Sequence, residues 1–353
     1  MTIAALIIFI FYNYQILSYL RGWNRLSTED SGKDVAVTVI VAFRNEALRL
    51  PSLLNDLKHQ NYPSTNIQYI FVDDSSEDSS FNIVDSFPIK KEVLKSPHFG
   101  KKAAIECAMQ YVKNDIILTT DADCRVGPNW VRKMTTPFTQ SKVQLAFGPV
   151  AFSELITLFD KLQAIEFMSL IASGAGAAGN KKPFMCNAAN LAFRKSVFEN
   201  TEQQIASGDD VFLLHHVKRN NGIISFVKER DAIVLTKPKA GISDFINQRK
   251  RWASKTSSYK DISALWSASI VLLTNLLLLY FLLTFQFEIF TVLYLLKSIV
   301  DYRFLKKASV FFQMEHLMYL FWGLQIIYPF YIVWVGISSQ LSSYNWKGRA
   351  YKK

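Results

Sequence analysis

The sequence predicts an α/β protein in which a mostly parallel sheet is covered by helices on both faces, with transmembrane helices before and after it. Two observations predict this class. Between residues 35 and 240, short runs rich in Val and Ile alternate with stretches of helical periodicity. Long apolar runs lie on both sides of this region, and half of the 353 residues are hydrophobic. The chain therefore combines a soluble domain with membrane segments.

The first apolar run, residues 2–20, contains no charge and is followed by Arg21 and Arg25. It lacks the basic start and the small-residue cleavage site of a signal peptide. We therefore expect residues 1–21 to form an N-terminal transmembrane helix that stays attached to the protein.

Residues 35–240 are expected to form one cytosolic domain that starts on a strand. The β-branched run VAVTVIVAF (35–43) predicts this strand, and the leucine spacing after it predicts an amphipathic helix. IQYIFVDD (67–74) and DIILTTDAD (115–123) predict two further strands, and GKKAAIECAMQYV (100–112) predicts a helix between them. Because strands alternate with helices, the strands should run mostly parallel.

All three predicted strands end in polar clusters, which read AFRNE, VDDSSEDSS and TTDADC. In open parallel sheets, ligands bind beyond the carboxyl ends of the strands. We therefore expect the three clusters to line one crevice.

Asp121 and Asp123 are the first candidate site in this crevice. At strand spacing both side chains point to the same side, and two carboxylates so close repel each other unless a cation lies between them. Carboxylate oxygens select Mg²⁺ or Mn²⁺ over softer metals, and Mg²⁺ commonly takes its remaining ligands from substrate phosphates. A surface turn with an aspartate helix cap is the alternative interpretation.

A second acidic pair, Asp209 and Asp210, precedes the apolar periodicity of VFLLHHV. Acidic residues in the first turn of a helix are stabilised by the helix dipole, so N-capping is one explanation. Alternatively, one of the two carboxylates acts as a general base, because a helix that starts near a crevice can direct it at a substrate hydroxyl.

The segment INQRKRWASK (246–255) is dense in basic residues and lies shortly before an apolar run. A basic amphipathic helix at an anionic bilayer surface would explain the charges, and we assign residues 241–262 to such an interface segment. It would not explain why Gln248, Arg251 and Trp252 share one helical face. A guanidinium can clamp a phosphate, and an indole can stack on a sugar or a lipid headgroup.

Residues 263–343 are expected to form a C-terminal membrane region. Apolar runs at 262–287 and 316–346 are each long enough to span a bilayer. A shorter run at 287–300 contains a lysine and either crosses the membrane or lies in its interface.

The flanking charges predict the orientation. Arg21, Arg25 and Lys33 precede the soluble domain and a basic cluster near 249–255 follows it, which places the domain in the cytosol. The basic tail at 344–353 also prefers the cytosol, so we expect an even number of crossings after residue 260.

Three further features predict no additional site. GAGAAG (174–179) matches the dinucleotide pattern GxGxxG, but it follows helical sequence and does not open a helix, so the required context is missing. The three cysteines form no CxxC pair, which argues against a disulfide framework or a structural zinc site and fits reduced thiols. The net charge of +11 suits nucleic acid, a membrane surface or an anionic substrate equally well.

The order of four motifs in this chain, flanked by membrane segments, resembles the membrane-bound family 2 glycosyltransferases. The motifs are VDD (72–74), DAD (121–123), GDD (208–210) and QRKRW (248–252). That family includes cellulose, chitin and hyaluronan synthases, dolichyl-phosphate sugar synthases and, more distantly, ceramide glucosyltransferases. AFRNE, FGKKAA and CNAANLAFRKSVF (186–198) also match its pattern. The resemblance covers nearly the whole chain and implies a GT-A-type fold.

The resemblance implies a nucleotide site at the ends of the first two strands. Asp74 would accept a hydrogen bond from the nucleotide base. Ala42, Arg44 and Glu46 would line the same pocket, and Lys101 would approach the nucleotide.

It also implies the catalytic and metal residues. Asp121 and Asp123 would face the diphosphate, with Asp123 the more direct metal ligand, and Asp210 would be the catalytic base. The chain has Gly-Asp-Asp where the large synthases have Thr-Glu-Asp, which leaves Asp209 as a second candidate for the base. The leaving diphosphate and the acceptor would be bound by Gln248, Arg251 and Trp252.

The implied function is an inverting transfer of a sugar from a UDP- or GDP-sugar to the hydroxyl of a membrane-associated, lipid-linked acceptor at the cytosolic face. Three or four candidate spans are few for a polymer channel, so we expect transfer of one or a few sugars, with a processive polysaccharide synthase of the same family as the alternative. From another class, a membrane-anchored carbohydrate-binding or scaffold protein without turnover remains possible. A glycoside hydrolase would need a flanking acid–base pair and gives no reason for the membrane segments. The expected partners are the donor, the acceptor, the membrane and Mg²⁺ or Mn²⁺, and not nucleic acid.

Overall fold

The computed structural model describes residues 2–27, 33–140, 142–199 and 209–341, together with 344–346 and 349–351. The chain folds into two compact units, each assembled from separate stretches of sequence. The sheet unit consists of Arg25–Ser153 and Pro183–Lys237, and the helical unit consists of Met1–Asn24, Glu154–Lys182 and Pro238–Lys353.

Among the described residues of the sheet unit, seven strands form one sheet. In spatial order they are β3 (Glu92–Lys95), β2 (Ile67–Asp73), β1 (Val37–Phe43), β4 (Ile116–Thr119), β7 (Leu191–Arg194), β5 (Val143–Phe147) and β8 (Ile223–Phe226). β7 runs antiparallel to both of its neighbours, and every other pairing in this sheet is parallel. The predicted fold class, a mostly parallel sheet with helices, is therefore confirmed.

The first strand and helix form as their sequence pattern predicts. β1 is buried along nearly its whole length, which suits its run of β-branched residues between two parallel neighbours. The helix α2 (Leu50–Lys58) buries the four leucines spaced at three and four residues, all of them at most 1% exposed. Also in this unit are α3 (Ser80–Ser86), α4 (Lys101–Met109), α5 (Trp130–Thr135), α7 (Lys195–Glu199), α8 (Asp209–Arg219) and the parallel pair β6 (Val150–Phe152) and β9 (Val234–Thr236).

The helical unit is built from six long helices. They are α1 (Thr2–Arg25), α6 (Leu158–Gly179), α9 (Ile242–Ser254), α10 (Ile262–Leu283), α11 (Phe287–Phe312) and α12 (Phe321–Leu341) among the described residues. A 3₁₀ segment (Glu315–Leu320) precedes α12, and the short strands β10 (Tyr344–Trp346) and β11 (Arg349–Tyr351) pair near the C-terminus.

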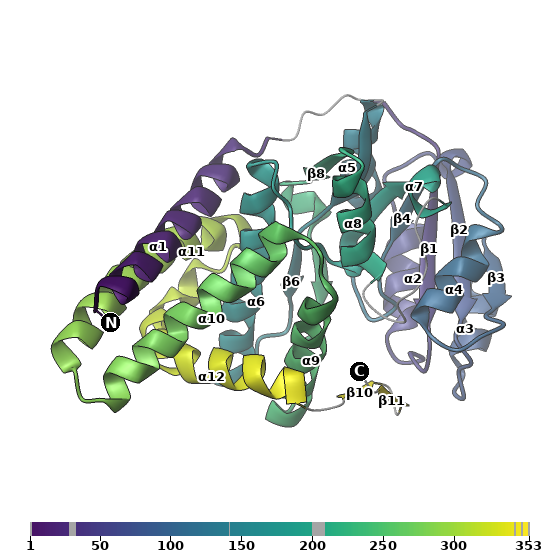
Figure 1. Ribbon diagram of the computed structural model, residues 1–353. Helices are drawn as coiled ribbons and strands as arrows, with labels where there is room; N and C mark the ends of the chain where they lie inside the picture. The colour runs from purple at the N-terminus through teal and green to yellow at the C-terminus, as the bar shows by residue number, and fades with distance from the viewer. Residues whose placement is uncertain are drawn as a thin grey trace. The chain divides into compact units, whose positions relative to one another are not determined.

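Within the helical unit, α1, α10 and α11 lie side by side (Figure 1). Phe9 of α1 packs in one apolar cluster with Phe281 near the end of α10 and Leu293 near the start of α11. Further along α1, the Tyr19 hydroxyl lies 2.8 Å from Ser267 Oγ near the start of α10. The Tyr19 ring lies 6.4 Å from that of Phe304, further along α11. The contacts therefore show that α11 runs in the same direction as α1 and that α10 runs in the opposite direction.

Three helices in the described part of the chain are long and apolar enough to cross a membrane. They are Ile3–Arg25, Ile262–Leu283 and Glu315–Ser339. Both ends of the chain thus carry candidate spans, as predicted. α11 is not among them, although with 26 residues it is longer than the short run that the sequence indicated.

Two charged residues of α11, Lys297 and Asp301, are paired inside the helical unit. Lys297 Nζ donates to Asp301 Oδ2 over 2.7 Å and to Gln325 Oε1 of α12 over 2.8 Å, and the Tyr12 hydroxyl of α1 donates to Asp301 Oδ1 over 2.9 Å. All four side chains are buried. Since every charge here has an opposite charge or a hydrogen-bond partner, α11 can pack among apolar helices despite its ionisable residues.

The GAGAAG stretch forms the last turns of α6, not a phosphate-binding loop. A Cβ on Gly176 would fall within the backbone of Tyr19, and Cβ atoms on Gly179 or Gly22 would meet the facing helix in the same way. The glycines therefore let α6 and α1 approach backbone to backbone, as small residues do in membrane helix pairs.

α6 also shows how the units interleave along the chain. It lies inside the range 35–240 that the sequence indicated as one domain, yet Glu154–Lys182 groups with the helical unit. The helix starts on a capping box between Thr157 and Asp160. The domain boundaries expected from the sequence stay a prediction. The structure adds that residues 154–182 belong to the helical unit.

Candidate functional site

Asp74 lies where β1, β2 and α4 meet, within the sheet unit. Its backbone N–H donates to Phe43 O at the end of β1 over 2.8 Å, and its Oδ1 accepts from the Gly100 N–H just before α4 over 2.7 Å. The residue is 4% exposed. A carboxylate that is held by an amide at a strand end is positioned to accept a further hydrogen bond from a ligand.

Two loops next to Asp74 are tied together by hydrogen bonds. The Glu46 N–H donates to Ser80 Oγ over 2.8 Å, and the Ala47 N–H donates to Asp78 Oδ2 over 3.1 Å. Asn45 has a left-handed φ of 53°. In this conformation its Oδ1 accepts from the Glu77 N–H over 2.8 Å.

The structure therefore brings the predicted nucleotide-pocket residues of β1 and its loop to the same strand ends as Asp74. Ala42 pairs with Val72 across the β1–β2 register, and Arg44 Nη2 lies 3.4 Å from Glu77 Oε1. Loop–loop bonds of this kind fix the backbone before any ligand arrives.

Asp121 and Asp123 do not lie at strand spacing, so the geometry expected from the sequence is wrong. β4 ends at Thr119, and the Cys124 N–H donates to Asp121 O over 3.1 Å, so the residues form a turn beyond the strand. The turn still gathers them, because one ligand atom each of Asp121, Asp123 and Cys124 lie within 4.8 Å of one another.

These residues fit a hard divalent cation through the carboxylates. Burial, followed by the charges of Asp121 and Asp123, raises the pKa of the Cys124 thiol well above its usual range. A protonated thiol is a poor metal ligand, whereas carboxylate oxygens suit Mg²⁺ and Mn²⁺. Asp121 and Asp123 would therefore hold the ion, and Cys124 would only line the site.

Lys101 lies against the same carboxylates. Its ammonium group forms an ion pair with Asp121 Oδ1. Burial alone would lower the pKa of Lys101, but attraction to Asp121 and, more weakly, to Asp210 raises it. One cationic side chain from the start of α4 thus interacts with both the predicted metal site and the predicted base.

Asp210 lies in the first turn of α8 and is bound to the segment 186–190. Its Oδ2 accepts from the Ala188 N–H over 3.0 Å, and Cys186 Sγ donates to its backbone O over 3.2 Å. Gly208 and the side chain of Asp209 lie outside the described residues. The choice between the two aspartates therefore stays a prediction in favour of Asp210.

Two residues of this region were missed by the sequence analysis. Arg49 Nη1 lies 3.5 Å from Asp123 Oδ2, and no motif marks it because it is a single basic residue directly before α2. Asn190, fully buried, donates to Pro149 O and Ala232 O over 2.8 Å each and accepts from Trp130 Nε1 over 3.0 Å. An Asn directly before the apolar strand β7 is the available signal, and its hydrogen bonds anchor the segment that holds Asp210.

Gln248, Arg251 and Trp252 belong to α9 in the helical unit, where Arg251 is half-buried. Gln248 Oε1 accepts from Arg249 Nη1 over 2.7 Å, and the Arg249 guanidinium lies 4.3 Å from the Trp252 ring centroid. The Arg249 side chain, which lies in the segment predicted to be at the membrane interface, is 3% exposed and is paired with Glu166, so it is not a surface charge. Sequence alone could not distinguish it from its charged neighbours.

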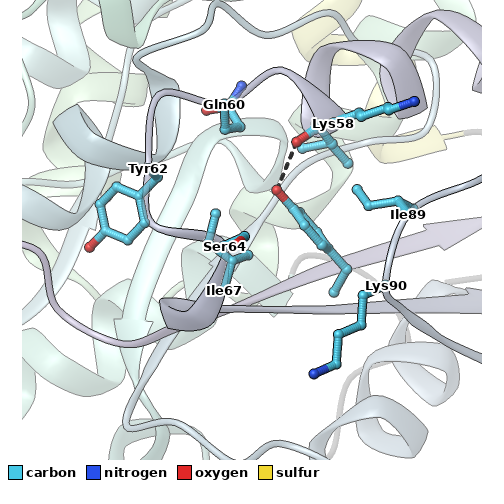
Figure 2. Close-up of a pocket in the computed structure, with 9 residues that line it drawn as sticks. Lys58, Gln60, Tyr62, Ser64, Ile67, Ile89 and Lys90 are labelled. Carbon is cyan, nitrogen blue, oxygen red and sulfur yellow. Dashed lines mark hydrogen bonds between the residues drawn. The ribbon is translucent and has the colours of Figure 1, made fainter.

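A separate cavity lies at the opposite end of β2, near its first residue, Ile67 (Figure 2). Across its floor the Tyr69 hydroxyl donates to Leu57 O over 2.8 Å. None of the predicted site residues lines it. The lining is Leu57, Lys58, Gln60, Tyr62, Ser64, Ile67, Tyr69, Ile89 and Lys90.

Comparison with known proteins finds similarity to glycosyltransferases. Residues 38–201 match the model of the family described as Glycosyl transferase family 2. The chain is 24% identical over 198 residues to the glycosyltransferase AglE of Haloferax volcanii, covering 52% of this chain and 60% of that protein. It is 29% identical over 104 residues to an undecaprenyl-phosphate 4-deoxy-4-formamido-L-arabinose transferase of Aeromonas hydrophila, covering 28% and 32% of the two. The chain thus spans less than two thirds of these curated relatives.

Among solved structures, a mannosyltransferase from Pyrobaculum calidifontis in complex with GDP-Man and Mn²⁺ is similar over 96% of this chain and 97% of its own. The TM-score is 0.59 at 14% sequence identity. At that identity the similarity shows the fold alone. The family model covers less than half of the chain, and the relatives that match are glycosyltransferases.

Proposed function

We propose that the protein is an inverting family 2 glycosyltransferase. It moves a sugar from a UDP- or GDP-sugar to a lipid-linked acceptor hydroxyl at the cytosolic face of a membrane. The observation that carries this proposal is the gathering of Asp121, Asp123, Lys101 and Asp210 at one edge of the sheet. The family match over residues 38–201 supports the same class.

The reaction is a single displacement at the anomeric carbon of the donor sugar. Asp210 takes the proton of the acceptor hydroxyl as the hydroxyl oxygen forms its bond to the anomeric carbon from the face opposite the diphosphate. The bond from that carbon to the diphosphate oxygen breaks, and the nucleoside diphosphate leaves with the electron pair. Because one displacement occurs, the anomeric configuration inverts.

Negative charge develops on the leaving diphosphate, and positive groups at the site stabilise it. A bound Mg²⁺ or Mn²⁺, held by Asp121 and Asp123, would supply Lewis-acid neutralisation. The Lys101 ammonium adds fixed positive charge, because its interactions with Asp121 and Asp210 keep it protonated. We assign the base pocket to Asp74 with Ala42, Arg44 and Glu46, and binding of the diphosphate and acceptor to Gln248, Arg251 and Trp252.

The decisive experiment measures release of UDP or GDP from sugar nucleotides by the purified full-length chain in nanodiscs. The lipid acceptor is a polyprenyl-linked saccharide, which carries free hydroxyls, and each assay is run with Mn²⁺ or with EDTA. We expect release that requires both the acceptor and the metal. Binding of sugar nucleotide without any release would instead indicate a carbohydrate-binding protein, and a long polymer among the products would indicate a processive synthase.

We further propose that the apolar end of the α1–α10–α11 bundle inserts into the bilayer. The turn between α10 and α11 exposes Phe285 and Phe287, which are 77% and 54% exposed. The opposite end of the parallel helices α1 and α11 carries Arg21, Arg303 and Lys307. Basic residues at one end and apolar residues at the other predict that the basic end faces the cytosol.

Cysteine labelling tests this orientation. In a Cys107→Ser background and in vesicles with the cytosolic face outward, Lys307→Cys should react with a membrane-impermeant maleimide. Phe285→Cys should react only after detergent is added, because lipid shields the turn. Equal labelling of both positions before detergent would contradict the proposed insertion.

A further inference from the structure

A buried ion pair in the helical unit joins α6 to α9. Arg249 Nε lies 3.0 Å from Glu166 Oε1, and Arg249 Nη2 lies 2.5 Å from Glu166 Oε2, so the pair is bidentate. The Tyr331 hydroxyl of α12 also donates to Glu166 Oε1, over 3.0 Å. The two charged side chains are 3% and 7% exposed. Three helices thus meet at one carboxylate.

The same guanidinium contacts two of the three motif side chains on α9. Its Nη1 donates to Gln248 Oε1 over 2.7 Å, and its centre lies 4.3 Å from the Trp252 ring centroid and 4.6 Å from that of Phe245. Arg249 therefore stands between Glu166 on one side and Gln248 and Trp252 on the other. Its five N–H donors and planar face allow it to hold an amide, a carboxylate and an indole at once.

A buried ion pair of this kind is a weak source of stability. Removing two charges from water costs several kcal/mol per ion, and well-packed apolar side chains of similar volume are often as stable or more stable. What the pair supplies is a fixed geometry, because the bidentate fork permits one orientation of the guanidinium. The orientation of Gln248 and Trp252 then follows from that of Arg249.

We propose that Arg249 and Glu166 are positioning residues, which hold Gln248 and Trp252 in the orientation needed for sugar transfer, with Tyr331 orienting the Glu166 carboxylate. This inference rests on the proposed function. It adds three residues to the Gln248, Arg251 and Trp252 motif. Arg249 lies on the same helix, whereas Glu166 and Tyr331 lie on α6 and α12. A small displacement of groups that bind a reacting substrate can cost about 100-fold in rate.

The test compares Arg249→Gln, Arg249→Lys, Glu166→Gln and Tyr331→Phe with the parent chain in nanodiscs. We expect Arg249→Gln and Glu166→Gln to lower kcat/KM for the lipid acceptor about 10- to 100-fold, while KM for the sugar nucleotide changes less than about threefold. Arg249→Lys keeps the charge but not the fork, so it should recover part of the loss. Tyr331→Phe removes one hydroxyl without changing the packing and should lose activity in the same direction.

The matched control is Lys250→Gln, which removes a positive charge from the adjacent position of the same helix and should leave both constants unchanged. Each variant is measured per folded molecule, with the melting temperature recorded beside it. Variants that melt earlier but keep the acceptor kcat/KM would overturn the inference, because a purely structural pair moves stability alone. If Arg249→Gln does not fold, Arg249→Lys and Tyr331→Phe decide the question. Failure of the proposed function looks different, since the parent chain itself would then release no nucleoside diphosphate.

Discussion

Asp210→Asn is expected to lower kcat about 10²- to 10⁴-fold, the range that a general base contributes. Its Oδ2 accepts a hydrogen bond from the Ala188 N–H, and the Asn side-chain oxygen can accept the same bond. The substitution therefore removes the capacity to take a proton while it keeps the segment 186–190 in place. Release of nucleoside diphosphate with a saturating hydroxyl acceptor measures the change.

The control for Asp210→Asn is Asp85→Asn, an exposed carboxylate on α3 that should have no effect on kcat. Asp209→Asn should cost far less than Asp210→Asn if the base is assigned correctly. An unchanged kcat in Asp210→Asn would contradict the assignment.

The elements that follow from local pattern were predictable from sequence. The four leucines of α2 repeat at three and four residues and are all buried, and β1 is a β-branched run buried between two parallel strands. In α2 the side-chain period fixes which face is buried, and in β1 the unbroken apolar run indicates burial on both faces. The convergence of Asp74 and the Asp121–Asp123 turn on the carboxyl ends of parallel strands follows from the same regularity.

The features that depend on distant partners were not predictable. The sequence of α6 does not indicate that this helix groups with the helical unit. Its glycines are explained only by their close contact with the backbone of α1. From the sequence, Arg249 cannot be distinguished from the other basic residues of its segment. In the structure it is paired with Glu166, which lies 83 residues earlier in the sequence. Burial of a charge is decided by its partner, and a linear sequence does not name the partner.

The candidate metal site was predictable from the sequence in part. The position of Asp121 and Asp123 after a buried strand predicts a candidate metal site. The sequence does not predict that a turn, and not strand alternation, brings the two carboxylates together. The Asp121 O to Cys124 N–H bond that closes the turn is a local detail of the backbone. This turn brings Cys124 close to the two carboxylates, so the thiol must be tested as a ligand beside Asp121 and Asp123.

Asp123→Asn is expected to abolish tight Mn²⁺ binding and to lower kcat by at least about 10²-fold, because loss of an ionised ligand removes both the ion and its neutralisation of the leaving diphosphate. Cys124→Ala should leave Mn²⁺ affinity and kcat nearly unchanged, since Mg²⁺ and Mn²⁺ take carboxylate oxygens as ligands and thiolates suit softer metals. Electron paramagnetic resonance of free Mn²⁺ during titration, in the presence of nucleoside diphosphate, measures affinity independently of turnover. Loss of binding in Cys124→Ala together with retention in Asp123→Asn would show that the ion is held by a thiolate, and the carboxylate site would then be wrong.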